Sequence, residues 1–215
     1  MTTDEYVLQR HRMVEDQIEA RGIRDGRVLE AMEAVPRHEF VTREARSWAY
    51  SDAPVGIGHG QTISQPYIVA LMTELLQLQG DECVLDVGTG SGYQAAVLSR
   101  LVVEVHSIEV IPELAATARA TLLRLGYRNV HVHVGDGSSG WAEAAPYGSI
   151  VVAAAAPAVP LPLLEQLDEG GRMVIPVGSS GFQQLEVWTC EGQEYKREVN
   201  LPVAFVPLRG EHGWK

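Results

Sequence analysis

The composition of this 215-residue chain is typical of a globular protein. Hydrophobic residues make up 46% of it and charged residues 21%, so it can bury a sizeable core. The formal net charge of -11 argues against a nucleic-acid partner, because phosphate binding requires clustered Lys and Arg and the basic residues here are scattered. We therefore expect a single domain with small appendages.

The start of the chain and its cysteines bear on the cellular compartment. No apolar run approaches the length of a membrane span, and residues 1–13 are polar and charged where a signal peptide needs an apolar stretch. Cys83 and Cys190 lie far apart in segments predicted as buried strands, so we expect free core thiols. These features predict a cytoplasmic protein without membrane contact.

Residues 1–60 predict a helical cap followed by a loop. Apolar residues at helical spacing indicate one helix over 6–20, and Asp25 is a good N-cap for a second over 27–35. The segment 52–61 is too rich in glycine for a regular element, so we expect a mobile loop. Its turn-forming residues are Pro54, Gly56, Gly58 and Gly60.

The region 61–178 alternates helices and strands. Such alternation is typical of a doubly wound, mostly parallel α/β sheet. A terminal segment, 179–215, adds strands without intervening helices. The predicted strands are 83–87, 104–109, 130–135, 150–154, 172–177, 185–189 and 203–208, and the predicted helices are 66–78, 93–101, 112–125 and 161–167.

A glycine-rich turn directly follows the first strand of this region. Gly88, Gly90 and Gly92 form a G-x-G-x-G pattern between the strand and the next helix. Glycines at such a turn let a ligand lie against the backbone. Dinucleotide-dependent oxidoreductases instead use G-x-G-x-x-G, which sets a pyrophosphate on the helix N-terminus. The spacing therefore favours a nucleoside ligand that has no phosphate at this point.

Acidic residues mark the ends of three successive predicted strands. Asp86 lies at the end of the first, Glu109 ends the second at a position suited to both ribose hydroxyls, and Asp136 with Gly137 follows the third. Taken singly, Asp86 could be a capping residue and Asp136 part of an ordinary turn. Because parallel strands end at one edge, we expect all of these residues to line one crevice with Gly88.

The segment Gly58–Tyr67 precedes the first helix of this region, which has proline in its first turn. Ser64 looks like the N-cap of that helix. Capping alone explains the serine, but it does not explain the glycine-rich approach to it.

Several segments spanning nearly the whole chain resemble the protein-L-isoaspartate O-methyltransferase family. The Gln-Thr-Ile-Ser-Gln-Pro motif is far more specific than the glycine turn, which methyltransferases share in general. The resemblance implies a Rossmann-like methyltransferase fold in one domain over 1–215. The segments are Met13–Val41, Gly58–Tyr67, Val84–Gln94, Val134–Trp141, Ala154–Pro157 and Gly170–Gly178.

The family resemblance implies an enzyme that repairs damaged proteins. Methyl transfer from S-adenosylmethionine to the free α-carboxylate of an L-isoaspartyl residue would leave S-adenosylhomocysteine and an ester that collapses to a succinimide. Isoaspartyl peptides and proteins are then the partners, and we expect a monomer. The implied catalytic residue is Ser64, and the implied cofactor-binding residues are Thr62, Ile63, Asp86, Gly88, Gly90, Gly92, Glu109, Asp136 and Gly137.

This chemistry requires neither a general base nor a metal. A carboxylate is already ionised at neutral pH and can attack a sulfonium methyl directly. Alignment and desolvation of the two reactants can contribute roughly 7 to 11 kcal/mol. Several positions depart from the expected pattern: Arg209 stands after Pro207-Leu208, where the family usually has threonine, Gly148 stands where methyltransferases often have an aspartate, and Ser138-Ser139 replaces a bulkier pair.

Other interpretations of the sequence are open or weaker. A related enzyme could methylate a small acid or a dedicated peptide, and a protein could bind the cofactor without turnover. A serine hydrolase lacks its G-x-S-x-G elbow here. His131 and His133 share one face of a predicted strand, but no third ligand is evident, so surface histidines are favoured over a metal site.

Overall fold

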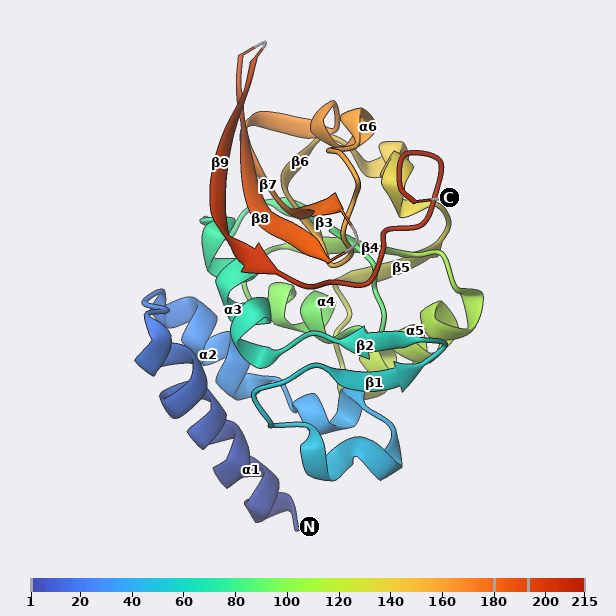
Figure 1. Ribbon diagram of the computed structural model, residues 1–215. Coiled ribbons are helices and arrows are strands. Elements are labelled where there is room, and N and C mark those ends of the chain that lie inside the picture. Colours follow the sequence, from blue (N-terminus) through green and yellow to red (C-terminus); the bar gives the residue numbers. More distant parts are fainter. Residues whose placement is uncertain (1, 180, 193, 215) are drawn as a thin grey trace.

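The computed structural model describes residues 2–179, 181–192 and 194–214, and its centre is a seven-stranded sheet (Figure 1). The strand order is β5-β4-β3-β6-β7-β8-β9. The strands are β3 (Cys83–Val87), β4 (Glu104–Glu109), β5 (Val130–Val134), β6 (Tyr147–Val152), β7 (Leu167–Ser179), β8 (Phe182–Glu191) and β9 (Glu194–Val203).

The direction of strand pairing confirms the predicted doubly wound sheet. Strands β5, β4, β3, β6 and β7 pair in parallel, and β8 and β9 add an antiparallel extension. The chain runs outward from β3 to β5, then returns to place β6 on the other side of β3. This reversal of strand order opens a crevice at the carboxyl ends of β3 and β6.

Helices cover the two faces of the sheet unequally. The helices α3, α4 and α5 lie on one face with α1 and α2 outside them, and the short α6 lies on the other (Figure 1). No helix in the described part of the chain has both the length and the apolar character needed to cross a membrane. The helices are α1 (Thr3–Arg12), α2 (Gly26–Ala34), α3 (Pro66–Leu75), α4 (Tyr93–Leu98), α5 (Pro112–Leu125) and α6 (Leu161–Leu164).

Alternation of side chains along the strands divides the core into two layers. Val84 and Val151 point toward the helix-rich face, and Leu85 and Ile150 point toward the face that carries α6. A parallel strand covered on both sides must be apolar on both. This accounts for the continuous hydrophobic runs in β3 and β6.

The N-terminal cap has the predicted helices. Helical structure runs from Thr3 to Arg21, with a π-helical turn at Met13–Ile18 after α1. The predicted N-cap of α2 is confirmed, because the Asp25 carboxylate accepts a hydrogen bond of 2.8 Å from the backbone of Arg27.

The loop predicted over 52–61 is wrong, because its second half forms a hairpin. β1 (Val55–Gly58) pairs antiparallel with β2 (Gln61–Ile63). The chain reverses through residues 58–60, whose φ angles of 93°, 52° and 70° are all positive. Two of these residues are glycine, so the glycines form the tight turn of a hairpin.

Four other predictions need correction. Ser64 is not a helix N-cap, because α3 begins after Gln65 and has no side-chain cap. The helix expected over 161–167 ends at Leu164, and the strand expected over 172–177 begins earlier, because β7 starts at Leu167. The strand expected over 203–208 lies earlier, as β9. Most of β9 is polar and exposed, so it lacks the apolar signal of a buried strand.

A buried arginine joins the N-terminal cap to the start of α3. The Arg37 guanidinium is 0% exposed; its Nε donates to the Ala49 carbonyl at 2.6 Å, and its Nη2 donates to the Ser64 carbonyl at 2.7 Å. It also lies over the Tyr93 ring at 4.8 Å. Burial lowers the pKa of Arg37 to about 10, so the group stays charged at neutral pH.

Arg37→Met should destabilise the fold. Loss of the guanidinium leaves two buried carbonyls without donors, at about 1 to 3 kcal/mol each, so we expect the free energy of unfolding to fall by about 2 to 6 kcal/mol. Urea denaturation followed by circular dichroism measures this change. The control is Arg43→Met, at an exposed side chain. An equal fall in the free energy of unfolding of both variants would show that Arg37 stabilises the fold no more than an exposed arginine does.

Candidate active site

The predicted crevice is a cavity that is open to solvent. It lies over the glycine-rich turn, at the carboxyl ends of β3 and β4, and β2 borders it. Most of the predicted site residues line it: Thr62, Ile63, Ser64, Gly88, Gly90, Glu109 and Gly137.

The glycine turn has the backbone conformation predicted for ligand binding. Gly88 and Gly90 have φ angles of 93° and 52° and face the cavity. Gly92 does not line it; a Cβ atom there would lie 3.2 Å from Leu122. The third glycine of the pattern therefore lets α4 pack against α5.

Glu109 lines the cavity beside the glycine turn. Its side chain is 6% exposed, and its two carboxylate oxygens accept hydrogen bonds from the backbone N–H groups of Gly90 at 2.8 Å and Ile111 at 3.0 Å. Each oxygen keeps a lone pair for a further donor. The carboxylate is thus fixed against the glycine turn and can bind a diol.

Asp86 is buried beneath the glycine turn and does not line the cavity. Its Oδ2 accepts from the Ser107 hydroxyl at 2.7 Å, and the Ser107 and Thr89 hydroxyls lie 2.6 Å apart. Its Oδ1 has no hydrogen-bond partner in the described part of the chain. Burial raises the pKa of Asp86 to about 7. These hydrogen bonds join β3, β4 and the glycine turn.

Asp136 also lies outside the cavity lining, because other groups occupy its carboxylate. One oxygen accepts from the backbone and hydroxyl of Ser138 at 2.8 and 2.6 Å, and the other accepts from the backbone of Glu211 at 2.7 Å. These hydrogen bonds outweigh desolvation and lower the pKa of Asp136. The side chain anchors the C-terminal segment, and Gly137 next to it faces the cavity.

Gly137 is required at its position by close packing. A Cβ atom there would lie 2.6 Å from Val87 Cγ1, closer than carbon atoms approach. The backbone of the turn therefore sits directly on the end of β3.

A second cavity adjoins the first, and the sequence did not predict it. Thr62, Ser64 and Ala153 line both cavities. The remainder of the second is formed by the extended segment 201–206 together with residues such as Arg21. These segments are far apart in sequence, so no local motif marks them.

Ser64 lies at this junction with a fixed backbone and an available side chain. Its carbonyl accepts from Arg37 at 2.7 Å, and its hydroxyl makes no hydrogen bond within the described residues. On the other side of the first cavity, Ile57 of the hairpin lies against Gly90, with its Cδ1 3.4 Å from the position of a Cβ there.

Positive charges lie at both cavities despite the acidic chain. Arg209, one of the residues that depart from the expected pattern, lines the first cavity. Arg21 lines the second, stacks over Tyr67 at 3.6 Å and pairs with Asp52 at 3.1 Å. Local fields of this kind can attract an anion that the net charge would repel.

Comparison with known proteins identifies one family. The family model for protein-L-isoaspartate(D-aspartate) O-methyltransferase matches residues 8–213. Protein-L-isoaspartate O-methyltransferase 2 of Marinobacter nauticus is 60% identical over 95% of this chain and 94% of its own. The Dictyoglomus thermophilum protein-L-isoaspartate O-methyltransferase is 51% identical over 99% of this chain and 96% of its own.

Solved structures have the same fold. A protein-L-isoaspartate O-methyltransferase superposes with a TM-score of 0.87 at 30% identity, over 95% of this chain and 67% of that one. A putative Plasmodium falciparum protein-L-isoaspartate O-methyltransferase, solved with S-adenosylhomocysteine, superposes with a TM-score of 0.81 at 24% identity, over 93% of this chain and 98% of that one. Together with the family match, these similarities mean that the chain belongs to the protein-L-isoaspartate(D-aspartate) O-methyltransferase family.

Proposed function

We propose that this enzyme methylates the free carboxylate of isoaspartyl residues in damaged proteins, and that Ser64 positions that carboxylate. S-adenosylmethionine supplies the electrophilic methyl group. The observation that carries the proposal is the junction of the two cavities at Thr62, Ser64 and Ala153. A methyl donor in one cavity and a peptide in the other would meet at the Ser64 hydroxyl.

The residues of the first cavity fit the cofactor. The two Glu109 oxygens have lone pairs for ribose hydroxyls, and the bare backbone of Gly88 and Gly90 lets a ligand approach closely. Thr62, Ile63 and Gly137 complete the proposed contacts. We assign Asp86, Gly92 and Asp136 to supporting this surface, because their side chains or packing lie behind it.

The second cavity fits an extended peptide. Residues 201–206 form an extended wall, and Arg21 adds a cation at the rim. We propose that this wall holds the backbone around the isoaspartyl residue. The Ser64 hydroxyl then donates one hydrogen bond to a carboxylate oxygen and leaves the other oxygen to attack.

Catalysis on this surface is a matter of orientation. The acceptor is already ionised at neutral pH, so no side chain has to remove a proton. Fixed reactant geometry can contribute roughly 7 to 11 kcal/mol. Closure of the β1–β2 hairpin over the glycine turn would exclude water from the reacting atoms.

We also propose a compartment, an oligomeric state and a class of partner for the enzyme. We place the enzyme in the cytoplasm as a monomer without a nucleic-acid partner, on the grounds of its thiol content, family resemblance and scattered basic residues. A dedicated peptide or small acid is the alternative acceptor. The extent of the second cavity favours a polypeptide.

A pair of matched peptides tests the acceptor. We expect labelled methyl from S-adenosylmethionine to reach a peptide with L-isoaspartate and not its counterpart with L-aspartate at the same position. Scintillation counting of the separated peptides measures transfer. Labelling of neither, with cofactor binding intact, would favour a dedicated substrate.

Ser64→Ala should reduce turnover and leave cofactor affinity nearly unchanged. One hydrogen bond to a charged group is worth about 1.5 to 3 kcal/mol, so we expect kcat/KM for the isoaspartyl peptide to fall about ten- to a hundredfold. Ser51→Ala, outside both cavity linings, is the control. Unchanged kinetics in Ser64→Ala would leave the serine without a substrate contact.

Glu109→Ala should weaken cofactor binding. The change removes the proposed ribose acceptor and the two hydrogen bonds that hold Gly90 and Ile111, so we expect the Kd for S-adenosylhomocysteine to rise at least tenfold. Titration calorimetry measures it, with Glu113→Ala on α5 as the control. An unaltered Kd would show that Glu109 does not bind the ribose.

A further inference from the structure

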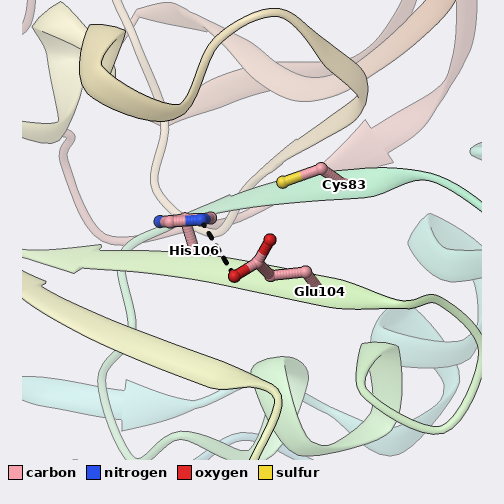
Figure 2. Close-up of side chains that lie close together, drawn as sticks. All are labelled: Cys83, Glu104 and His106. Atoms are coloured by element: carbon pink, nitrogen blue, oxygen red, sulfur yellow. Dashed lines mark ion pairs between the residues drawn. The ribbon is translucent and has the colours of Figure 1, made fainter.

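A cluster of metal-binding side chains lies on the face of the sheet that carries α6. Cys83 begins β3, Glu104 begins β4, and His106 follows two residues later on the same face. The parallel register sets Cys83 opposite Glu104. One ligand atom from each of the three residues lies within 4.8 Å of the others, and Figure 2 shows the three side chains converging between the two strands.

Two histidines on β5 hold this cluster in place. His106 Nδ1 lies 2.9 Å from His133 Nε2, and His131 Nε2 lies 2.9 Å from Glu104 Oε1. The His133 ring is stacked between those of His106 and Trp141. These are the two histidines for which the sequence offered no third ligand, since their partners are on neighbouring strands.

The contacts leave the coordinating atoms available. His106 presents the Nε2 lone pair to a cation in the tautomer whose Nδ1–H donates to His133, and this Nε2 lies 3.7 Å from Glu104 Oε1. Metal-bound histidines in general direct their other nitrogen to a partner in this way.

Binding of a cation changes the protonation of the cysteine. Coordination replaces the S–H bond of Cys83 with a sulfur–metal bond and releases the proton to solvent.

We propose that Cys83, Glu104 and His106 bind a zinc ion, with a water molecule in the fourth tetrahedral position. Sulfur, imidazole nitrogen and one carboxylate oxygen form a ligand set that suits zinc and disfavours magnesium or calcium. None of the three residues lines either cavity at the active site. The site is thus separate from both cavities, and a bound ion would join β3 to β4.

Zinc titration of the untagged full chain, freed of metal by a chelator, tests the proposal. Calorimetry with zinc chloride should give one saturable site, and Cys83→Ser and His106→Ala should each raise its Kd at least tenfold. Cys190→Ser is the matched control, because that thiol lies on β8, and its Kd should equal that of the parent. Magnesium chloride should produce no saturable heat.

Cobalt(II) provides a readout that reports the thiolate directly. A sulfur-to-cobalt charge-transfer band should appear in the parent and in Cys190→Ser and be absent in Cys83→Ser. The Glu104 side chain is half-exposed, so we expect Glu104→Gln to leave the fold intact. This variant should also weaken zinc binding. No saturable zinc binding by the parent, or equal affinity in parent and Cys83→Ser, would overturn the proposal.

Discussion

The buried guanidinium of Arg37 is the interaction on which the geometry of the site depends. No carboxylate pairs with it in the described part of the chain, so the carbonyls of Ala49 and Ser64 have to compensate for its desolvation. Separating these segments would leave a buried charge without partners. The N-terminal cap contributes no residue to the lining of the first cavity, yet through Arg37 it fixes the backbone of Ser64, which does line it.

The rest of the active site is likewise built from separate segments of the chain. The carboxyl ends of β3 and β4 border the first cavity, and segments outside the parallel strands form most of the second. They meet at three residues, so the reacting groups would be aligned by how two substructures dock. An acceptor that is already ionised needs only such alignment, and the buried Asp86, with its raised pKa, is free to serve as internal support.

The sequence predicted the elements with strong periodicity and missed those defined by long-range contacts. The bounds of β3 and α5 agree with the predictions because an apolar run marks the first and a proline start marks the second. The hairpin at β1 and β2 is missed because its glycines predict a loop, and the exposed β9 because its pattern is polar. Among the expected site residues, Glu109 and Gly88 line the cavity, but Asp86 and Asp136 do not. Their position at a strand end was visible in the sequence, whereas the hydrogen bonds that occupy them were not.

The outer edge of the sheet has a consequence for an enzyme that meets damaged polypeptides. β9 is an edge strand, and the β8–β9 ribbon extends past its neighbours in Figure 1. An open edge is a template for strand addition and aggregation. Its exposed residues include charges of both signs, Glu194, Lys196, Arg197 and Glu198. Charged edge side chains discourage pairing with a foreign strand, so a partly unfolded client can be released after methylation without nucleating a fibril on the protein that repairs it.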